Sequence, residues 1–150
     1  MYAPGIVVLV GLRLPAHPPW FGTRDGGPGP LDWVGIESAK GRPVTDGAVP
    51  VVAHLSDDLS ASLFDAPDAE VLRHAVPALQ DLLGSGAAEP AWSQVKRWRY
   101  AAARSRLSYD EMNPPGSRIV ICGDSVAATP DLDAVVETGR AAARQVSADR

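Results

Sequence analysis

One stretch near the C-terminus, Ser117-Arg-Ile-Val-Ile-Cys-Gly-Asp124, constrains the architecture of the chain. Its run of β-branched apolar residues predicts a short buried strand over residues 118–122 that ends in Gly-Asp. A helix is predicted next, running to about Val146, with Thr129 as its cap. One strand followed by one helix cannot make a parallel sheet by itself. This strand–helix unit therefore needs partner strands from elsewhere.

The residues before this unit predict an antiparallel sheet with one flanking helix. The first strand candidate is apolar on both alternating faces, which is typical of a strand buried on both sides. An apolar stripe at helical spacing predicts a helix that stops at Gly84, with a kink or a break at Pro77. Because no helix separates the early strands, the fold class is α+β. The strand candidates are 5–12, 31–37, 49–55 and 95–101.

The bulk composition excludes several classes of protein. The chain has 150 residues, of which 45% are hydrophobic and 21% charged, as in an ordinary folded domain. Its net charge of -4 and its isoelectric point near 5.2 argue against a nucleic-acid or anionic-membrane partner. The longest apolar run, residues 6–10, is too short to span a bilayer. With no recognisable signal peptide, we expect a cytoplasmic protein.

Metal-binding and cysteine chemistry are not expected. His17, His54 and His74 have no metal-ligand spacing, and no acidic cluster joins them, so we predict no metal. The single cysteine, Cys122, cannot form a disulfide within the chain. Its place in the predicted strand indicates inert packing in the core. Lys40 reads as a surface residue in a loop after a strand.

The C-terminal unit carries a resemblance to a known family. A strand ending in Gly-Asp, followed by a helix with Asp133-Ala134 and Thr138-Gly139, resembles the C-terminal flavin motif of the FAD-dependent amine-oxidase and renalase-like oxidoreductases. Residues 94–101 are similar to the strand that crosses back from the substrate domain of that family. Residues 2–55 are similar to its substrate-domain sheet. The chain departs from the family's pattern at Asp131 and at Ala134, where the family has glycine.

The resemblance implies two domains. Residues 1–101 would form the substrate-domain-like antiparallel sheet and helix. Residues 117–150 would form the last strand–helix element of an FAD/NAD(P)-binding, Rossmann-like domain. That domain opens with a Gly-x-Gly-x-x-Gly turn that holds the FAD pyrophosphate, and no such turn follows a strand in this chain. We therefore expect the chain to be the C-terminal half of such an enzyme, from a truncated reading frame or a split protein.

The resemblance also implies where FAD is held. The residues that would border the cofactor are Gly123, Asp124, Leu132, Asp133 and Ala134. An ionised carboxylate such as Asp124 only accepts hydrogen bonds, which suits the hydroxyls of the ribityl chain. The alternative is a loop aspartate that caps a local turn. For the side chain of Asp133, a solvent-facing position in the first turn of the helix is the simpler interpretation.

Aromatic and basic residues alternate on the strand predicted before the C-terminal unit. Trp98 and Tyr100 are candidates for the wall of a substrate pocket, although core packing is the commoner role of such aromatics. On the opposite face, Arg97 and Arg99 are candidates for the phosphates of a nicotinamide substrate. Exposed arginines without such a role are the commoner case.

The function implied by the resemblance is flavin redox chemistry on a small-molecule substrate. Hydride would pass from an amine or a reduced nicotinamide to FAD, with oxygen as the acceptor. No catalytic residue is predicted. Because the chain lacks a pyrophosphate site, we expect weak or no FAD binding and no activity from the chain alone. Two alternatives stay open: a non-catalytic module that completes a separately encoded FAD-binding chain, and a small α+β protein without flavin.

Overall fold

The computed structural model describes residues 2–14, 22–24, 29–42, 47–84, 90–129 and 131–148. The chain divides into two compact units. The larger unit is Pro4–Arg99, and the smaller one combines Met1–Ala3 with Tyr100–Arg150. No helix within the described ranges is long and apolar enough to cross a membrane.

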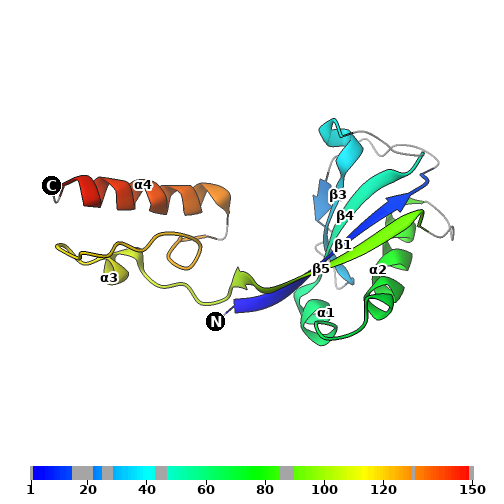
Figure 1. The fold of residues 1–150 in the computed structure, drawn as a ribbon, viewed down its shortest axis with the longest axis horizontal. Coiled ribbons are helices and arrows are strands. Elements are labelled where there is room, and N and C mark those ends of the chain that lie inside the picture. The colour runs from blue at the N-terminus through cyan, green and yellow to red at the C-terminus, as the bar shows by residue number, and fades with distance from the viewer. Residues whose placement is uncertain are drawn as a thin grey trace. The chain divides into compact units, whose positions relative to one another are not determined.

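The five described strands form one five-stranded sheet. The strands are β1 (Tyr2–Leu12), β2 (Gly22–Arg24), β3 (Leu31–Ile36), β4 (Val49–Leu55) and β5 (Trp92–Ala103). β1 pairs antiparallel with β4, and β3 pairs antiparallel with β4 and with β2. β5 runs antiparallel to β1, because the Ala91 amide just before β5 donates to the Gly11 carbonyl near the end of β1. The predicted antiparallel sheet is confirmed, although β2 was not expected. Across the sheet, the strands lie in the order β2-β3-β4-β1-β5 (Figure 1).

The core of the larger unit lies on one face of this sheet. α1 (Asp57–Ser62) and α2 (Asp68–Leu83) cover that face (Figure 1). On the other face Val7 and Leu9 of β1 are only half-buried, so the prediction that β1 is buried on both sides is wrong. The buried core side chains from strands and helices are Ile6, Val8, Val10, Leu12, Leu31, Val34, Ile36, Val49, Val51, Ala53, Leu55, Val71, Ala75, Leu79 and Leu83.

A buried serine connects α1 to β1. The Ile6 amide donates to Ser60 Oγ at 3.1 Å, and the Ser60 hydroxyl donates to the Leu55 carbonyl at 3.5 Å. Replacing Ser60 by alanine leaves the Ile6 amide unpaired in the core, so we expect the free energy of unfolding to fall by about 1–2 kcal/mol. Urea unfolding measures this change.

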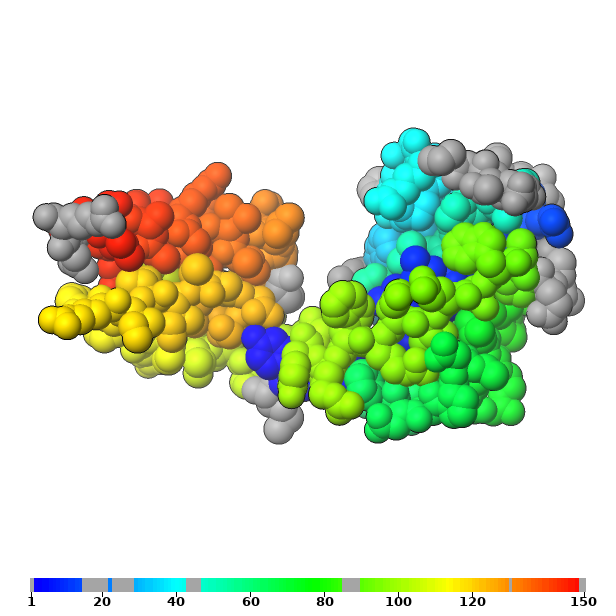
Figure 2. Space-filling view, in the orientation of Figure 1, coloured from blue at the N-terminus to red at the C-terminus, as the bar shows by residue number. Residues whose placement is uncertain are grey.

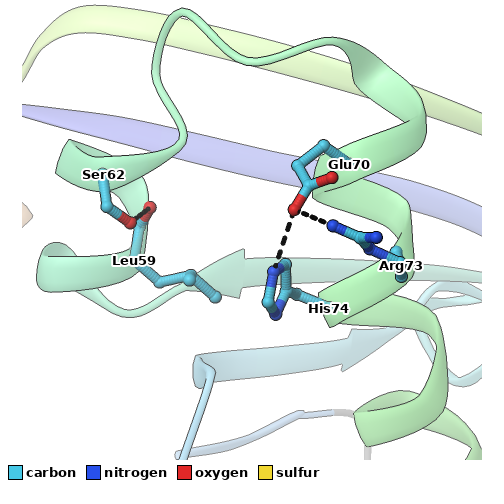
Figure 3. Close-up of polar contacts among 5 residues, drawn as sticks. All are labelled: Leu59, Ser62, Glu70, Arg73 and His74. Atoms are coloured by element: carbon cyan, nitrogen blue, oxygen red, sulfur yellow. Dashed lines mark hydrogen bonds and ion pairs between the residues drawn. The ribbon is translucent and has the colours of Figure 1, made fainter.

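The matched control lies two residues along the same helix. The Ser62 hydroxyl donates to the Leu59 carbonyl at 3.0 Å on the exposed side of α1 (Figure 3). Ser62→Ala should therefore change stability by less than about 0.5 kcal/mol. Equal losses for the Ser60 and Ser62 variants would contradict the buried role of Ser60.

The helices differ from the predictions in two respects. α1 was not expected, although Ser56 caps it by accepting from the Leu59 amide at 3.4 Å. α2 runs through Pro77 as one helix, so the predicted break is absent. Pro77 has no amide to donate to the Arg73 carbonyl, and Arg73 lies on the exposed side of the helix. In the first turn of α2, a hydrogen bond from Arg73 lowers the pKa of the Glu70 carboxyl, and His74 Nε2 lies 3.4 Å away (Figure 3).

The smaller unit has a core of small side chains. α3 (Tyr109–Met112) and the extended segment that follows it lie alongside α4 (Leu132–Ala148) (Figure 1). Gln145 of α4 donates to the Asn113 carbonyl at 3.3 Å and to the Pro114 carbonyl at 3.4 Å. The predicted C-terminal helix is thus confirmed. The buried residues of the unit are Ala103, Asn113, Val126, Ala127, Thr138 and Ala142.

The strand predicted over residues 118–122 is not formed. The Asn113 side chain takes the place of one strand neighbour, because Ile121 N donates to Asn113 Oδ1 at 2.6 Å and Asn113 Nδ2 donates to the Ile121 carbonyl at 2.9 Å. No strand within the described ranges lies on the other side. Ile119 is consequently 74% exposed, and Cys122 is exposed rather than packed in a core as predicted. The segment lies at the surface of its unit (Figure 2).

Candidate cofactor site

The Gly123–Asp124 turn is anchored to the helix that follows it. The backbone of Gly123 has φ 122, in the left-handed region that favours glycine. Its amide donates to Thr138 Oγ1 at 2.9 Å, and the Thr138 hydroxyl in turn donates to the Val135 carbonyl at 2.7 Å. Thr138 is buried, and these bonds are partly shielded from water. The threonine of the motif therefore fixes the turn against α4.

Asp124 presents its carboxylate at the surface of this turn. Its Oδ1 accepts a hydrogen bond of 3.2 Å from the Tyr2 hydroxyl. Desolvation and the adjacent Asp124 carboxylate raise the pKa of the Tyr2 hydroxyl. The tyrosine therefore keeps its proton and acts as a donor, while the second carboxylate oxygen is left for another donor. An exposed carboxylate oxygen of this kind fits the hydroxyl of a ribityl chain or a sugar.

Asp131 caps the N-terminus of α4. Its Oδ1 accepts from the Ala134 amide at 2.8 Å, and its Oδ2 accepts from the Thr129 hydroxyl. The predicted cap, Thr129, is therefore wrong: it supports the carboxylate that does the capping. The hydrogen bond from Thr129, followed by that from the Ala134 amide, lowers the pKa of Asp131.

The residues at the start of α4 are less suited to contact a flavin ring than the Gly123–Asp124 turn is to bind a hydroxyl. Leu132 is 76% exposed and Asp133 is exposed, so both are accessible. The Ala134 amide, however, is already bonded to the Asp131 carboxylate. A helix N-terminus with a bound carboxylate is not free to receive the negative charge of a reduced flavin. The turn is therefore the better match to the cofactor that the resemblance implies.

The cap makes α4 sensitive to acid. A depressed folded-state pKa gives a stabilisation that is present above the ordinary aspartate value near ~4 and is lost as pH falls through the lower value in the folded state. We expect the helical circular dichroism of the wild type to fall more steeply in this range than that of Asp131→Asn, because asparagine also caps but does not titrate. Superimposable pH profiles for the two proteins would contradict this expectation.

Trp98 and Tyr100 are exposed, at 60% and 74%. The prediction that they pack in the core is wrong, because no element covers that face of β5 within the described residues. Tyr100 makes an edge-on contact with Tyr2, with ring centroids 6.1 Å apart. Tyr100 thus lies next to the aromatic ring that contacts Asp124.

Arg97 has a structural role that the sequence did not indicate. Its guanidinium donates to the Phe64 carbonyl at 2.9 Å, to the Ala66 carbonyl at 2.6 Å and to Asp68 Oδ1 at 2.6 Å. These contacts occupy the group, which corrects both the surface prediction and the suggested phosphate contact. Arg99 lies over the Phe64 ring at 4.7 Å. The sequence held no signal for Arg97, because two of its acceptors are main-chain carbonyls.

The other residues singled out in the sequence do not join the turn. Lys40 lies in a 3-10 helix, η1 (Glu37–Lys40), where it donates to Glu37 at 2.6 Å and lies 5.2 Å from the Trp33 ring centroid. Across the described ranges, no three His, Cys, Asp or Glu residues come together as metal ligands. His17 lies outside the described residues.

Comparison with known proteins gives a family and a fold. The profile of the family described as flavin containing amine oxidoreductase matches residues 24–147. A protein of Exiguobacterium sp. 255-15 assigned as a protoporphyrinogen oxidase has a TM-score of 0.69 at 13% identity, over 99% of this chain and 35% of its own. A protein from Pyrococcus furiosus has a TM-score of 0.60 at 13% identity, over 97% of this chain and 32% of its own.

The family match and the structural matches support different conclusions. At 13% identity the two solved structures show a shared fold and nothing about substrates. The chain spans about a third of the length of each of them. Among curated proteins, none matches the sequence.

Proposed function

Because the chain belongs to the flavin-containing amine oxidoreductase family, we propose that it forms part of an FAD-dependent oxidoreductase that takes hydride from an amine or a reduced nicotinamide. The flavin, when bound, supplies the redox chemistry, and dioxygen is the proposed acceptor of the electrons. Residues 1–101 are the proposed substrate-domain part, and residues 117–150 are the proposed end of the FAD-binding domain.

One observation supports this proposal above the others. The Gly-Asp turn and the threonine of the helix motif, which are 15 residues apart in the sequence, are joined by the hydrogen bond from the Gly123 amide to Thr138 Oγ1. The profile of the family also covers both segments. A motif whose parts contact each other in the fold is a stronger indication of a site than the same residues in a sequence.

In the proposed site, each residue has a distinct task. Asp124 accepts a hydrogen bond from a hydroxyl of the ribityl chain or of the ribose. Gly123 leaves room for the cofactor, because a Cβ added there would meet nothing within 4 Å. Leu132 and Asp133 border the flavin ring through their main chain. Ala134 can do so only when its amide is released from Asp131. Trp98 and Tyr100 are the proposed walls of the substrate pocket.

The smaller unit offers a surface for the rest of the enzyme. Along residues 117–122, the backbone groups of Ile119 and Ile121 bond to Ser117 and Asn113. The backbone groups on the opposite edge of this segment have no hydrogen-bond partner among the described residues. We propose that this edge joins the parallel sheet of a dinucleotide-binding part that carries the Gly-x-Gly-x-x-Gly turn, on the same polypeptide or on a separate one. The apolar side chains available to such a contact are Ile119, Ile121, Leu132 and Val136.

This surface also favours the second candidate function. A module that completes a separately encoded FAD-binding chain needs an exposed strand edge bordered by apolar side chains. Residues 117–122 form no strand in this structure, and Ile119 and Ile121 are exposed, so we propose that this segment becomes such an edge when the FAD-binding chain pairs with it.

The oxidoreductase proposal is tested by anaerobic reduction of the flavin in the complete assembly. The assembly is this chain combined with the polypeptide that carries the glycine-rich turn. Addition of an amine or a reduced nicotinamide should bleach the visible flavin absorbance, and admission of air should restore it. A flavin that is bound and yet stays oxidised with both substrate classes would contradict the proposed reaction.

A further inference from the structure

We propose that Tyr2 is a positioning residue for Asp124, holding one carboxylate oxygen so that the other faces the hydroxyls of a bound flavin nucleotide. This role rests on the proposed function of the Gly123–Asp124 turn. It adds a residue from the opposite end of the chain, outside the motif that carries the resemblance.

The geometry ties the two ends of the chain together. Tyr2 and Asp124 are 122 positions apart, and the tyrosine hydroxyl donates to Asp124 Oδ1 at 3.2 Å. The Tyr2 ring also contacts Tyr100 edge-on, with an interplanar angle of 81°. The main chain next to Asp124 is held by Thr138 through the Gly123 amide. The carboxylate is therefore fixed both through its backbone and through one of its oxygens.

The chemistry of this arrangement selects the kind of group that can bind. With Oδ1 engaged, Oδ2 remains as an oriented acceptor, so the matching ligand group is a hydroxyl donor. A phosphate placed at the same point would be repelled by the carboxylate. The ligand class is thus a polyol portion of a nucleotide, either the ribityl chain or the ribose. Fixing the carboxylate before binding lowers the loss of side-chain entropy when the ligand arrives.

The test compares two tyrosine hydroxyls of the same unit. Tyr2→Phe removes the hydroxyl that contacts Asp124. Tyr109→Phe is the control, because the buried Tyr109 hydroxyl has no hydrogen-bond partner among the described residues. FAD affinity is measured by quenching of flavin fluorescence with the full chain in the complete assembly. Thermal unfolding of each variant verifies that it is folded.

We expect Tyr2→Phe to raise the Kd for FAD by about 3- to 10-fold, the effect of one hydrogen bond, and Tyr109→Phe to leave it unchanged. In an Asp124→Ala background, Tyr2→Phe should have no further effect, because its partner is gone. An unchanged Kd for Tyr2→Phe overturns the positioning role, and so does the same penalty in both backgrounds. If the wild-type assembly binds no FAD, the proposed function fails together with the role of Tyr2.

Two further ligands identify the hydroxyls that Asp124 receives. Riboflavin has the ribityl chain without the adenosine, and ADP has the ribose without the ribityl chain. A loss of riboflavin affinity in Tyr2→Phe assigns the ribityl chain, and a loss of ADP affinity assigns the ribose. Lumiflavin, which lacks the ribityl chain, should bind both proteins equally. A Tyr2→Phe effect of equal size on lumiflavin overturns the proposal, because no polyol is then involved.

Discussion

Replacing Arg97 by alanine is expected to lower the free energy of unfolding by about 2–4 kcal/mol. The guanidinium connects β5 to the segment between α1 and α2 through the carbonyls of Phe64 and Ala66 and through Asp68. Its side chain is only 25% exposed, so loss of the guanidinium leaves two half-buried carbonyls without their donor. Charged donors give the larger values among measured hydrogen-bond contributions. Urea unfolding, followed by circular dichroism, measures the change.

The neighbouring arginine of the same strand is the matched control. Arg99 lies over the Phe64 ring and is exposed, so Arg99→Ala should cost less than about 1 kcal/mol. Arg97→Lys should recover only part of the loss, because an ammonium group cannot reproduce the planar set of donors. Similar losses for Arg97→Ala and Arg99→Ala would show that the carbonyl contacts contribute little.

Replacing Asp124 by alanine is expected to weaken FAD binding to the complete assembly by about 10- to 100-fold. A hydrogen bond to a charged acceptor contributes about 1.5–3 kcal/mol, and each factor of ten in Kd corresponds to about 1.4 kcal/mol. Asp124→Asn should lose less, since its side-chain carbonyl still accepts one hydrogen bond. Fluorescence titration with FAD gives the affinities.

An exposed aspartate elsewhere in the same unit controls for the loss of charge. Asp110, in α3, is exposed, and Asp110→Asn removes one negative charge away from the turn. Its affinity for FAD should match that of the wild type. If Asp124→Ala binds as tightly as Asp110→Asn, the carboxylate is not part of the cofactor site.

The sheet could be predicted from the sequence because its strands carry their own signal. In β4 the buried residues alternate with less buried ones, and β3 carries the apolar Leu31, Val34 and Ile36; both strands lie within a residue of the predicted ranges. β2 has only three residues, Gly22–Arg24, too few to show alternation. α1 was missed because it follows a strand directly, although Ser56 and the acidic residues after it are an ordinary start signal for a helix.

The C-terminal unit could be predicted in part. The helix pattern fixed α4, and the resemblance singled out the turn and the threonine that contact each other. The prediction of a strand at 118–122 was wrong because a strand forms only beside a neighbouring strand. Here the Asn113 side chain bonds the backbone of Ile121 instead. The Tyr2–Asp124 contact joins the two ends of the chain, and no local pattern reports such a pair.

The most direct test of the account is an FAD titration of the purified chain, alone and combined with the polypeptide that carries the glycine-rich turn, followed by flavin fluorescence. We predict saturable binding in the combination and weak or no binding to the chain alone, with the binding in the combination weakened by Asp124→Ala. Absence of FAD binding in the combination would contradict the account, and so would tight binding that is indifferent to Asp124.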